Sequence, residues 1–287
     1  MDEQGEYPRY LPADPVTGGI LFHCLLDPGS DLYWKQFTCA IRGNLNVELF
    51  HRAWEEVVAR HPSLQAIFVS ERRERPLQVV RRNIDLPWEG MDWTALGTEE
   101  QEAKFREFVQ NDRLDGYDLA LGPLMRFALM RIGPEHHRFV WGSHHLLVDG
   151  WSSQLVLNEV FDVYDRLARG EAAPAGKSLV FRSYVEWLLK QDWADVEKFF
   201  RTHLSGMKAP TPMVVDRFSG STGPTTREAR TEEATLSAAG TSQLKAFARA
   251  RKMTLNTVVQ AAWGLLLNRY SSELGYDFWP LRAYRER

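Results

Sequence analysis

The sequence predicts an α/β protein with two lobes. Helical spacing of apolar residues alternates with short continuous apolar runs, and no segment repeats with a fixed period. The chain has 287 residues, 44% of them hydrophobic and 25% charged, which is enough for two hydrophobic cores. Residues 171–176 have the small, aperiodic composition of a linker. We therefore expect one lobe over residues 1–175 and a second over residues 176–287.

Composition excludes several classes of partner. A net charge of -3 and a pI near 6.3 provide no basic field for a nucleic-acid backbone. The acidic start, residues 1–6, lacks an apolar segment, and no later run approaches the roughly 18 apolar residues of a membrane span. The two cysteines, Cys24 and Cys39, match neither a disulfide framework nor a metal spacing. We expect a cytoplasmic protein without metal, bound cofactor, membrane or nucleic acid.

Two helices are expected before the central strands. From residue 44 to residue 60, apolar side chains recur on one helical face, and Pro62 stops the run. Thr98 and Gln101 have the spacing of a capping box, which would begin the second helix. Its buried stripe would consist of Phe105, Phe108 and Val109.

Two strands are expected next, over Leu124–Ile132 and Arg138–Ser143. Both runs are rich in Phe, Val and other apolar residues, and Gly133-Pro134-Glu135 separates them as a tight connection. The second run is almost continuously apolar, which indicates a central strand covered on both faces. It ends at His144 and His145.

A further helix is expected after Gly150, with Ser152 or Ser153 as its N-cap and Gly170 at its end. For the second lobe, the apolar spacing predicts one long helix from about residue 182 to residue 203. A long polar loop would follow over residues 210–226, and two more helices over residues 242–251 and 256–270.

The segment from His144 to Gly150, His-His-Leu-Leu-Val-Asp-Gly, carries the strongest chemical signal. Burying an imidazole requires partners for both ring nitrogens, so the pair is either a satisfied structural pair or a functional one. The complete pattern favours function: one imidazole as base or orienting group, Asp149 to fix the loop, and Gly150 at a turn that a side chain would obstruct. Adjacent strand residues face opposite sides, which argues against zinc held by His144, His145 and Asp149.

This segment resembles the HHxxxDG signature of the condensation domains of nonribosomal peptide synthetases. Residues 60–68, RHPSLQAIF, resemble the RHxxLRTxF motif of that family, with Gln65 and Ala66 in place of its second arginine and its threonine. Further resemblances lie at residues 19–28, 181–188 and 254–271. Several matches in one order identify the chain as a member of this family.

The resemblance implies a two-lobed fold like that of chloramphenicol acetyltransferase. It implies amide formation between an acyl or peptidyl donor and an aminoacyl acceptor, both held as thioesters on phosphopantetheine arms of carrier domains that work beside adenylation domains. By position, His145 would be the catalytic histidine, and His144, Asp149 and Gly150 would support it. Asp149 would hold the loop through a cation, for which Arg60 is the candidate.

Three other functions remain open from the sequence. One is a related acyltransferase that uses coenzyme A or an alcohol acceptor, and another is a noncatalytic remnant or carrier-docking module. The third is an epimerisation domain, which shares the HHxxxDG motif, although Trp151 after Asp149 and Gly150 favours condensation. The resemblance also bears on the end of the chain, because residues 279–287 match nothing in the family. We therefore expect a C-terminally truncated chain with an incomplete second lobe and a doubtful activity of its own.

Overall fold

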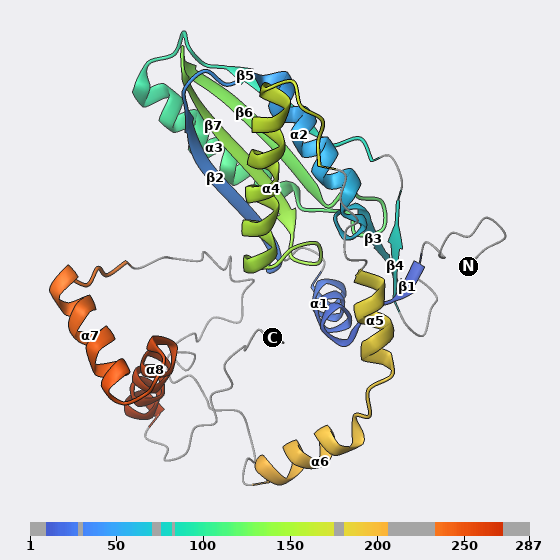
Figure 1. The fold of residues 1–287 in the computed structure, drawn as a ribbon, viewed down its shortest axis with the longest axis vertical. Helices are drawn as coiled ribbons and strands as arrows, with labels where there is room; N and C mark the ends of the chain where they lie inside the picture. Colours follow the sequence, from blue (N-terminus) through green and yellow to red (C-terminus); the bar gives the residue numbers. More distant parts are fainter. Residues whose placement is uncertain are drawn as a thin grey trace, which may run out of the picture. The chain divides into compact units, whose positions relative to one another are not determined.

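The computed structural model describes residues 10–27, 31–70, 76–81, 84–174, 181–205 and 233–271 (Figure 1). Contacts divide the chain into two compact units, residues 1–191 and residues 192–287. The expected lobe boundary at residues 175/176 remains a prediction, because residues 175–180 lie outside the described residues.

A four-stranded sheet forms the centre of the first unit. Its order is β2-β7-β6-β5, and β7 pairs antiparallel with both of its neighbours. β5 and β6 are parallel, and helix α3 connects them. The strands are β2 (Trp34–Arg42), β5 (Trp88–Asp92), β6 (Met125–Gly133) and β7 (His136–His144). The two expected strands and the central position of the second are thus confirmed.

Helices cover both faces of this sheet (Figure 1). α2 (Val47–Arg60) and α4 (Gly150–Ala168) lie on one face, and α3 (Thr98–Asp115) lies on the other. Because side chains alternate along β7, Trp141 packs on Trp54 of α2 while Val140 packs with Phe105 and Phe108 of α3. The apolar character of β7 therefore follows from burial on both faces.

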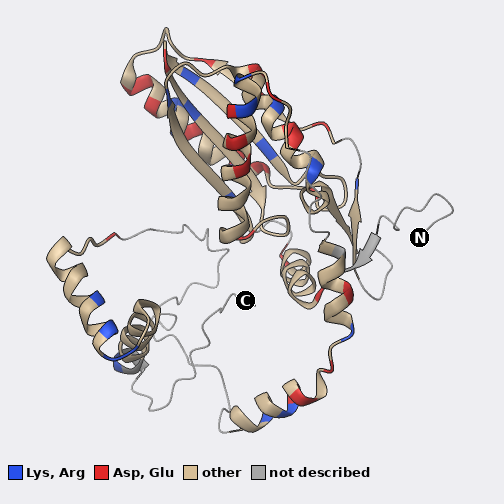
Figure 2. Cartoon of the chain, viewed as in Figure 1, with Lys and Arg blue, Asp and Glu red and all other residues tan. Residues whose placement is uncertain are grey.

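Smaller elements complete the first unit. The antiparallel sheet β1-β4-β3 lies beside the short helix η1, and Asp14 caps α1 by accepting hydrogen bonds from Val16 and Thr17 amides. These elements are β1 (Tyr10–Pro12), α1 (Pro15–Leu26), η1 (Pro62–Gln65), β3 (Ala66–Val69), β4 (Leu77–Val80) and α5 (Phe181–Leu189). Figure 2 shows both basic and acidic residues on α2, whereas the charged residues of α4 are mainly acidic.

The expected helix from residue 44 to residue 60 is confirmed, but the expected start of α3 is wrong. Gly97 is the N-cap residue of α3 and makes no side-chain cap. The Gln101 side chain donates instead to the carbonyls of Trp93, Leu96 and Ile132. The Gln101 side chain therefore ties the start of α3 to the preceding turn and to the end of β6 instead of forming a capping box with Thr98.

The second unit contains α6 (Ala194–His203), α7 (Ala238–Ala250) and α8 (Leu255–Ser271). α7 and α8 confirm the two expected helices, whereas the single helix over residues 182–203 is wrong. It is interrupted at residues 190–193; Trp193 is the N-cap residue of α6, and the Asp192 carboxylate accepts from the Ala194 amide beside it. The expected loop at residues 210–226 lies outside the described residues. Among the described helices, none has the length and apolarity to cross a membrane.

A buried polar cluster lies between the sheet and α3. Asp112 of α3 is 7% exposed and accepts from Gln36 Nε2 at 2.6 Å and from the Arg126 guanidinium. Arg126 also lies 4.6 Å from the centre of the Tyr117 ring. A Cβ atom on Gly142 of β7 would meet the Tyr117 hydroxyl at 2.8 Å. Gly142 therefore leaves the space that this cluster fills.

We predict that Gly142→Ala lowers the free energy of unfolding by about 1–3 kcal/mol, because the added methyl group overpacks the cluster. Gly90→Ala in β5 is the matched control, since a Cβ atom there meets nothing within 4 Å. Urea denaturation of both variants measures the effect. Equal stability of the two variants would contradict the packing account.

Candidate active site

The histidine pair lies where β7 ends and a short loop leads into α4. The His144 amide still donates to the Leu124 carbonyl of the β6 side, at 2.9 Å, and the His145 amide donates to the Tyr33 carbonyl at 2.8 Å. The loop then turns back, with the Leu147 amide 3.0 Å from the His144 carbonyl. Backbone hydrogen bonds thus hold both histidines at the end of the sheet.

The His144 ring is buried and has a partner on each nitrogen. Its Nδ1 accepts from the Leu146 amide at 3.2 Å, so the proton of the neutral ring is on Nε2. Nε2 lies 3.7 Å from Cys24 Sγ of α1. Burial, reinforced by His145, lowers the pKa of His144 to about 4. His144 is therefore a neutral imidazole at pH 7.

The His145 ring has different surroundings. It packs edge-on against Tyr33, with ring centres 6.3 Å apart. Its Nδ1 is buried and has no hydrogen-bond partner among the described residues. In the described part of the chain, the two neighbouring imidazoles thus differ, because only His144 has both ring nitrogens engaged.

Asp149 is the N-cap residue of α4. Its carboxylate accepts from the Ser152 amide at 2.7 Å and from the Ser152 hydroxyl, in a capping box. Burial alone would raise the pKa of Asp149, but the hydrogen bonds from Ser152 and Trp151 and the charge of Lys35 lower it below its ordinary value. The expectation of Ser152 or Ser153 as N-cap is therefore wrong, because the carboxylate about one turn earlier takes that position.

Arg60 does not pair with Asp149 in the structure. Its guanidinium lies 2.5 Å from Glu159 Oε1, and His61 Nε2 lies 2.6 Å from the other oxygen of the same carboxylate. The expected pairing of Arg60 with Asp149 is wrong, because Glu159, further along α4, provides the acceptor. Sequence reasoning missed Glu159, and its only signal was its place in the predicted helix, next to Val160 of the apolar stripe.

Gly150 also differs from expectation. It is the first residue of α4, its φ is not positive, and a Cβ atom there would meet nothing within 4 Å. No described residue therefore obstructs a side chain at this position. Among the described residues, no contact explains why glycine stands there.

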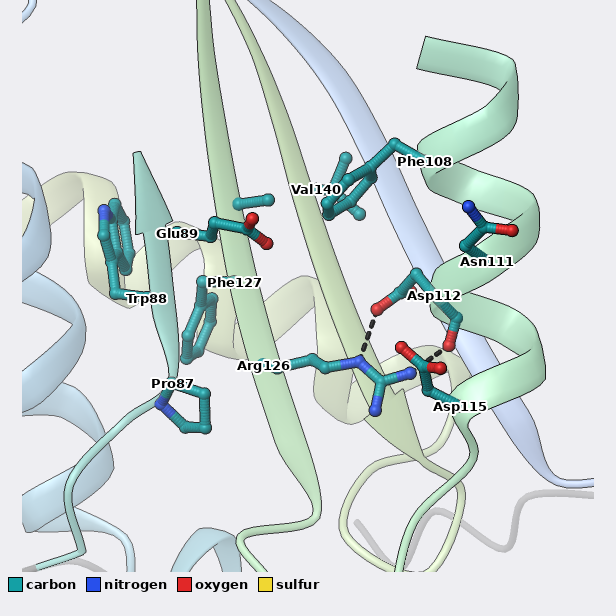
Figure 3. A pocket seen from close by; sticks show the side chains of 11 residues that line it. Pro87, Trp88, Glu89, Phe108, Asn111, Asp112, Asp115, Arg126, Phe127 and Val140 are labelled. Atoms are coloured by element: carbon teal, nitrogen blue, oxygen red, sulfur yellow. Dashed lines mark hydrogen bonds and ion pairs between the residues drawn. The ribbon is translucent and has the colours of Figure 1, made fainter. Parts of the chain in front are cut away.

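A pocket of about 400 Å³ lies away from the histidines, between α3 and strands β5, β6 and β7 (Figure 3). Its apolar wall includes Phe108 and Val140, and Arg126 points at Asp112 on its polar side. None of the motif residues from His144 to Gly150 lines it. Among the described residues, no three His, Cys, Asp or Glu side chains gather as a metal site.

Comparison with known proteins gives a match over most of the chain. The family model described as "Condensation domain" matches residues 9–276. A linear gramicidin synthase of Brevibacillus parabrevis is 37% identical over 276 residues, which are 95% of this chain and 4% of that protein. Chondramide synthase cmdD of Chondromyces crocatus is 42% identical over 244 residues, 85% of this chain and 6% of that protein. The chain thus spans a small part of these relatives.

Solved structures show the same fold. The first condensation domain of the calcium-dependent antibiotic synthetase superposes with a TM-score of 0.73 at 20% identity, over 92% of this chain and 62% of that one. The starter condensation domain of rhizomide synthetase gives a TM-score of 0.63 at 19% identity, over 71% of this chain and 50% of that one. The expected α/β fold of the chloramphenicol acetyltransferase type is confirmed by these likenesses.

We predict that Asp149→Ala lowers the free energy of unfolding by about 0.5–2 kcal/mol, the usual cost of losing an N-cap. Asp149→Asn should lose much less, because its amide oxygen still accepts from the Ser152 amide. Urea denaturation at pH 7 measures both variants. A loss of about 3–5 kcal/mol in each would indicate a broken buried ion pair instead.

We also predict a pH dependence of stability that originates in His144. Below about pH 6.5 the unfolded chain binds a proton on this histidine, while the folded chain does not until about pH 4. As the pH is lowered from about 6.5 to about 4, the free energy of unfolding therefore falls by about 1.4 kcal/mol per pH unit. Below about pH 4 this contribution levels off, because both states then bind the proton. Denaturation of the parent and of His144→Gln at pH 7, 6 and 5 isolates this contribution. Parallel pH profiles of the two proteins would contradict it.

Proposed function

The chain belongs to the condensation-domain family of nonribosomal peptide synthetases, and from this premise we propose that it forms an amide bond between two carrier-bound thioesters. The donor is an acyl or peptidyl thioester and the acceptor is an aminoacyl thioester. The acceptor amine attacks the donor carbonyl carbon, so a C–N bond forms and the donor C–S bond breaks. The amine loses one proton and the departing thiolate gains one.

The observation that carries this proposal is the difference between the two imidazoles. His144 is neutral and engaged at both nitrogens, so it has no free site for a reactant. His145 follows it at the end of β7, and its Nδ1 has no hydrogen-bond partner among the described residues. We assign the reactive role to His145 and a supporting role to His144.

We favour a positioning role for His145 over general-base catalysis. Nδ1 of His145 is buried without a hydrogen-bond partner among the described residues, so no contact fixes the tautomer of this ring as the Leu146 amide does for His144. In the tautomer with its proton on Nε2, the ring can donate a hydrogen bond to a reactant and orient it. Holding an amine and a thioester together supplies much of the acceleration in such a reaction, so a strong base is not required.

Partners and compartment belong to the same proposal. The substrates would arrive on phosphopantetheine arms of carrier domains, loaded by adenylation domains, and the chain itself would bind no cofactor. The similarity to peptide synthetases supports these partners. The two free thiols, Cys24 and Cys39, support a reducing compartment, for which we propose the cytoplasm.

We predict that His145→Ala lowers the single-turnover rate of dipeptide formation from loaded carriers by about a hundredfold, the cost of losing a positioning contact. His136→Ala is the matched control, because His136 is an exposed histidine at the other end of β7. It should keep the parent rate. Equal rates for the parent and His145→Ala would refute the assignment, and carrier binding without any dipeptide would indicate a docking module.

A further inference from the structure

The loop between His145 and Asp149 is attached at both of its ends to the beginning of strand β2. At the start of the loop, the His145 amide donates to the Tyr33 carbonyl at 2.8 Å. At its end, Lys35 Nζ donates to the Ser153 hydroxyl at 3.1 Å and to the Val148 carbonyl at 3.5 Å. Tyr33 and Lys35 are two residues apart, so one short segment of chain holds the whole loop.

The contact at Ser153 extends into the cap of α4. The hydroxyl that accepts from Lys35 donates to the Asp149 carbonyl at 2.6 Å. The Ser153 amide donates to the same carbonyl at 3.0 Å. Lys35 is therefore connected through one side chain to the backbone of the residue that begins the helix.

The place of Lys35 is electrostatically unfavourable for a cation. The N-terminus of a helix carries a partial positive charge, which repels an ammonium group. Burial lowers the pKa of Lys35, and the Asp149 carboxylate opposes this only in part. General stability therefore does not explain a lysine at this place, whereas its contacts with the Val148 carbonyl and the Ser153 hydroxyl link the loop and the helix start to β2.

Arg60 cannot perform this task, because Glu159 holds its guanidinium. Gln65, which stands where the resembled motif has a second arginine, donates to the Val58 and Ala59 carbonyls at the end of α2. Lys35 is the cation that acts on Asp149 in the described part of the chain.

We propose that Lys35 is a positioning residue for amide formation, which fixes the end of the His145 loop relative to β2 and so the place of the His145 ring. The proposal rests on the function proposed above for His145. Lys35 acts through Ser153 and Val148 and touches no reacting group. A displacement of about 1 Å at a reacting group can cost on the order of a hundredfold in rate, so a loosened loop is enough to impair the reaction.

The test compares Lys35→Met, which keeps the length of the side chain without its donors, with Lys35→Arg, which keeps a cation and donors. Lys104→Met is the matched control, because Lys104 is an exposed lysine of α3. With loaded carriers and the full chain, Lys35→Met should lower kcat by about ten- to a hundredfold and change KM by less than about twofold. Lys35→Arg should recover part of kcat, and Lys104→Met should match the parent.

Hydrogen exchange provides a readout that is independent of activity. In Lys35→Met, the amides of Asp149, Ser152 and Ser153 should exchange faster than in Lys104→Met, while the amides of β7 up to Trp141 keep the parent rate. If Lys35→Met does not fold, Ser153→Ala removes the contact of Lys35 with the helix start but keeps its contact with the Val148 carbonyl, and it should give faster exchange at the Ser152 and Ser153 amides. This variant leaves the lysine in place.

Two results overturn the proposal. The first is parent-like kcat together with parent-like exchange in Lys35→Met, and the second is exchange that rises uniformly over the first unit, which indicates a merely structural role. Failure of the proposed function is a separate result, because it shows as full activity of His145→Ala. The exchange pattern at the loop still tests Lys35 in that case.

Discussion

Two contacts on the His144 ring are the constraint on which the site depends. The Leu146 amide occupies Nδ1, and the thiol of Cys24 lies next to Nε2. A buried imidazole with an unsatisfied nitrogen would cost the fold stability, so the turn after β7 and the position of α1 have to provide these partners together. Because His144 is neutral and engaged at both ring nitrogens, the proposed function assigns the chemistry to the next residue, His145.

The rest of the first unit holds this arrangement through β2, α2 and α4. β2 pairs with β7 in a register that places Trp34 opposite His144, and the Tyr33 carbonyl just before it receives the His145 amide. α2 is joined to α4 through the Glu159 carboxylate, which Arg60 and His61 share. Asp149 begins α4 as its cap. The two sequence motifs, RHPSL and HHLLVDG, therefore meet through α4 rather than through a direct ion pair.

Local patterns predicted the strands β6 and β7 and the helix α2 because apolar spacing and turn residues are properties of neighbouring residues. The histidine pair was also predicted as a functional site from neighbouring residues, because it is part of the segment from His144 to Gly150. What the sequence did not reveal depends on distant groups: the acceptor for Arg60 is a glutamate 99 residues away, and the side chain of Gln101 donates to the Ile132 carbonyl 31 residues away. The break before α6 was missed because the apolar pattern continues across it, although the Asp192 carboxylate beside it accepts from the Ala194 amide.

The most direct test of this account is a measurement, by ¹⁵N NMR of the histidine rings, of the protonation state and tautomer of His144. The account predicts that His144 is neutral at pH 7 and at pH 6, with its proton on Nε2 and with Nδ1 accepting from the Leu146 amide. An imidazolium signal for His144 at pH 6, or a proton on its Nδ1, would contradict the account, because His144 would then not be locked and the assignment of roles within the pair would lose its basis.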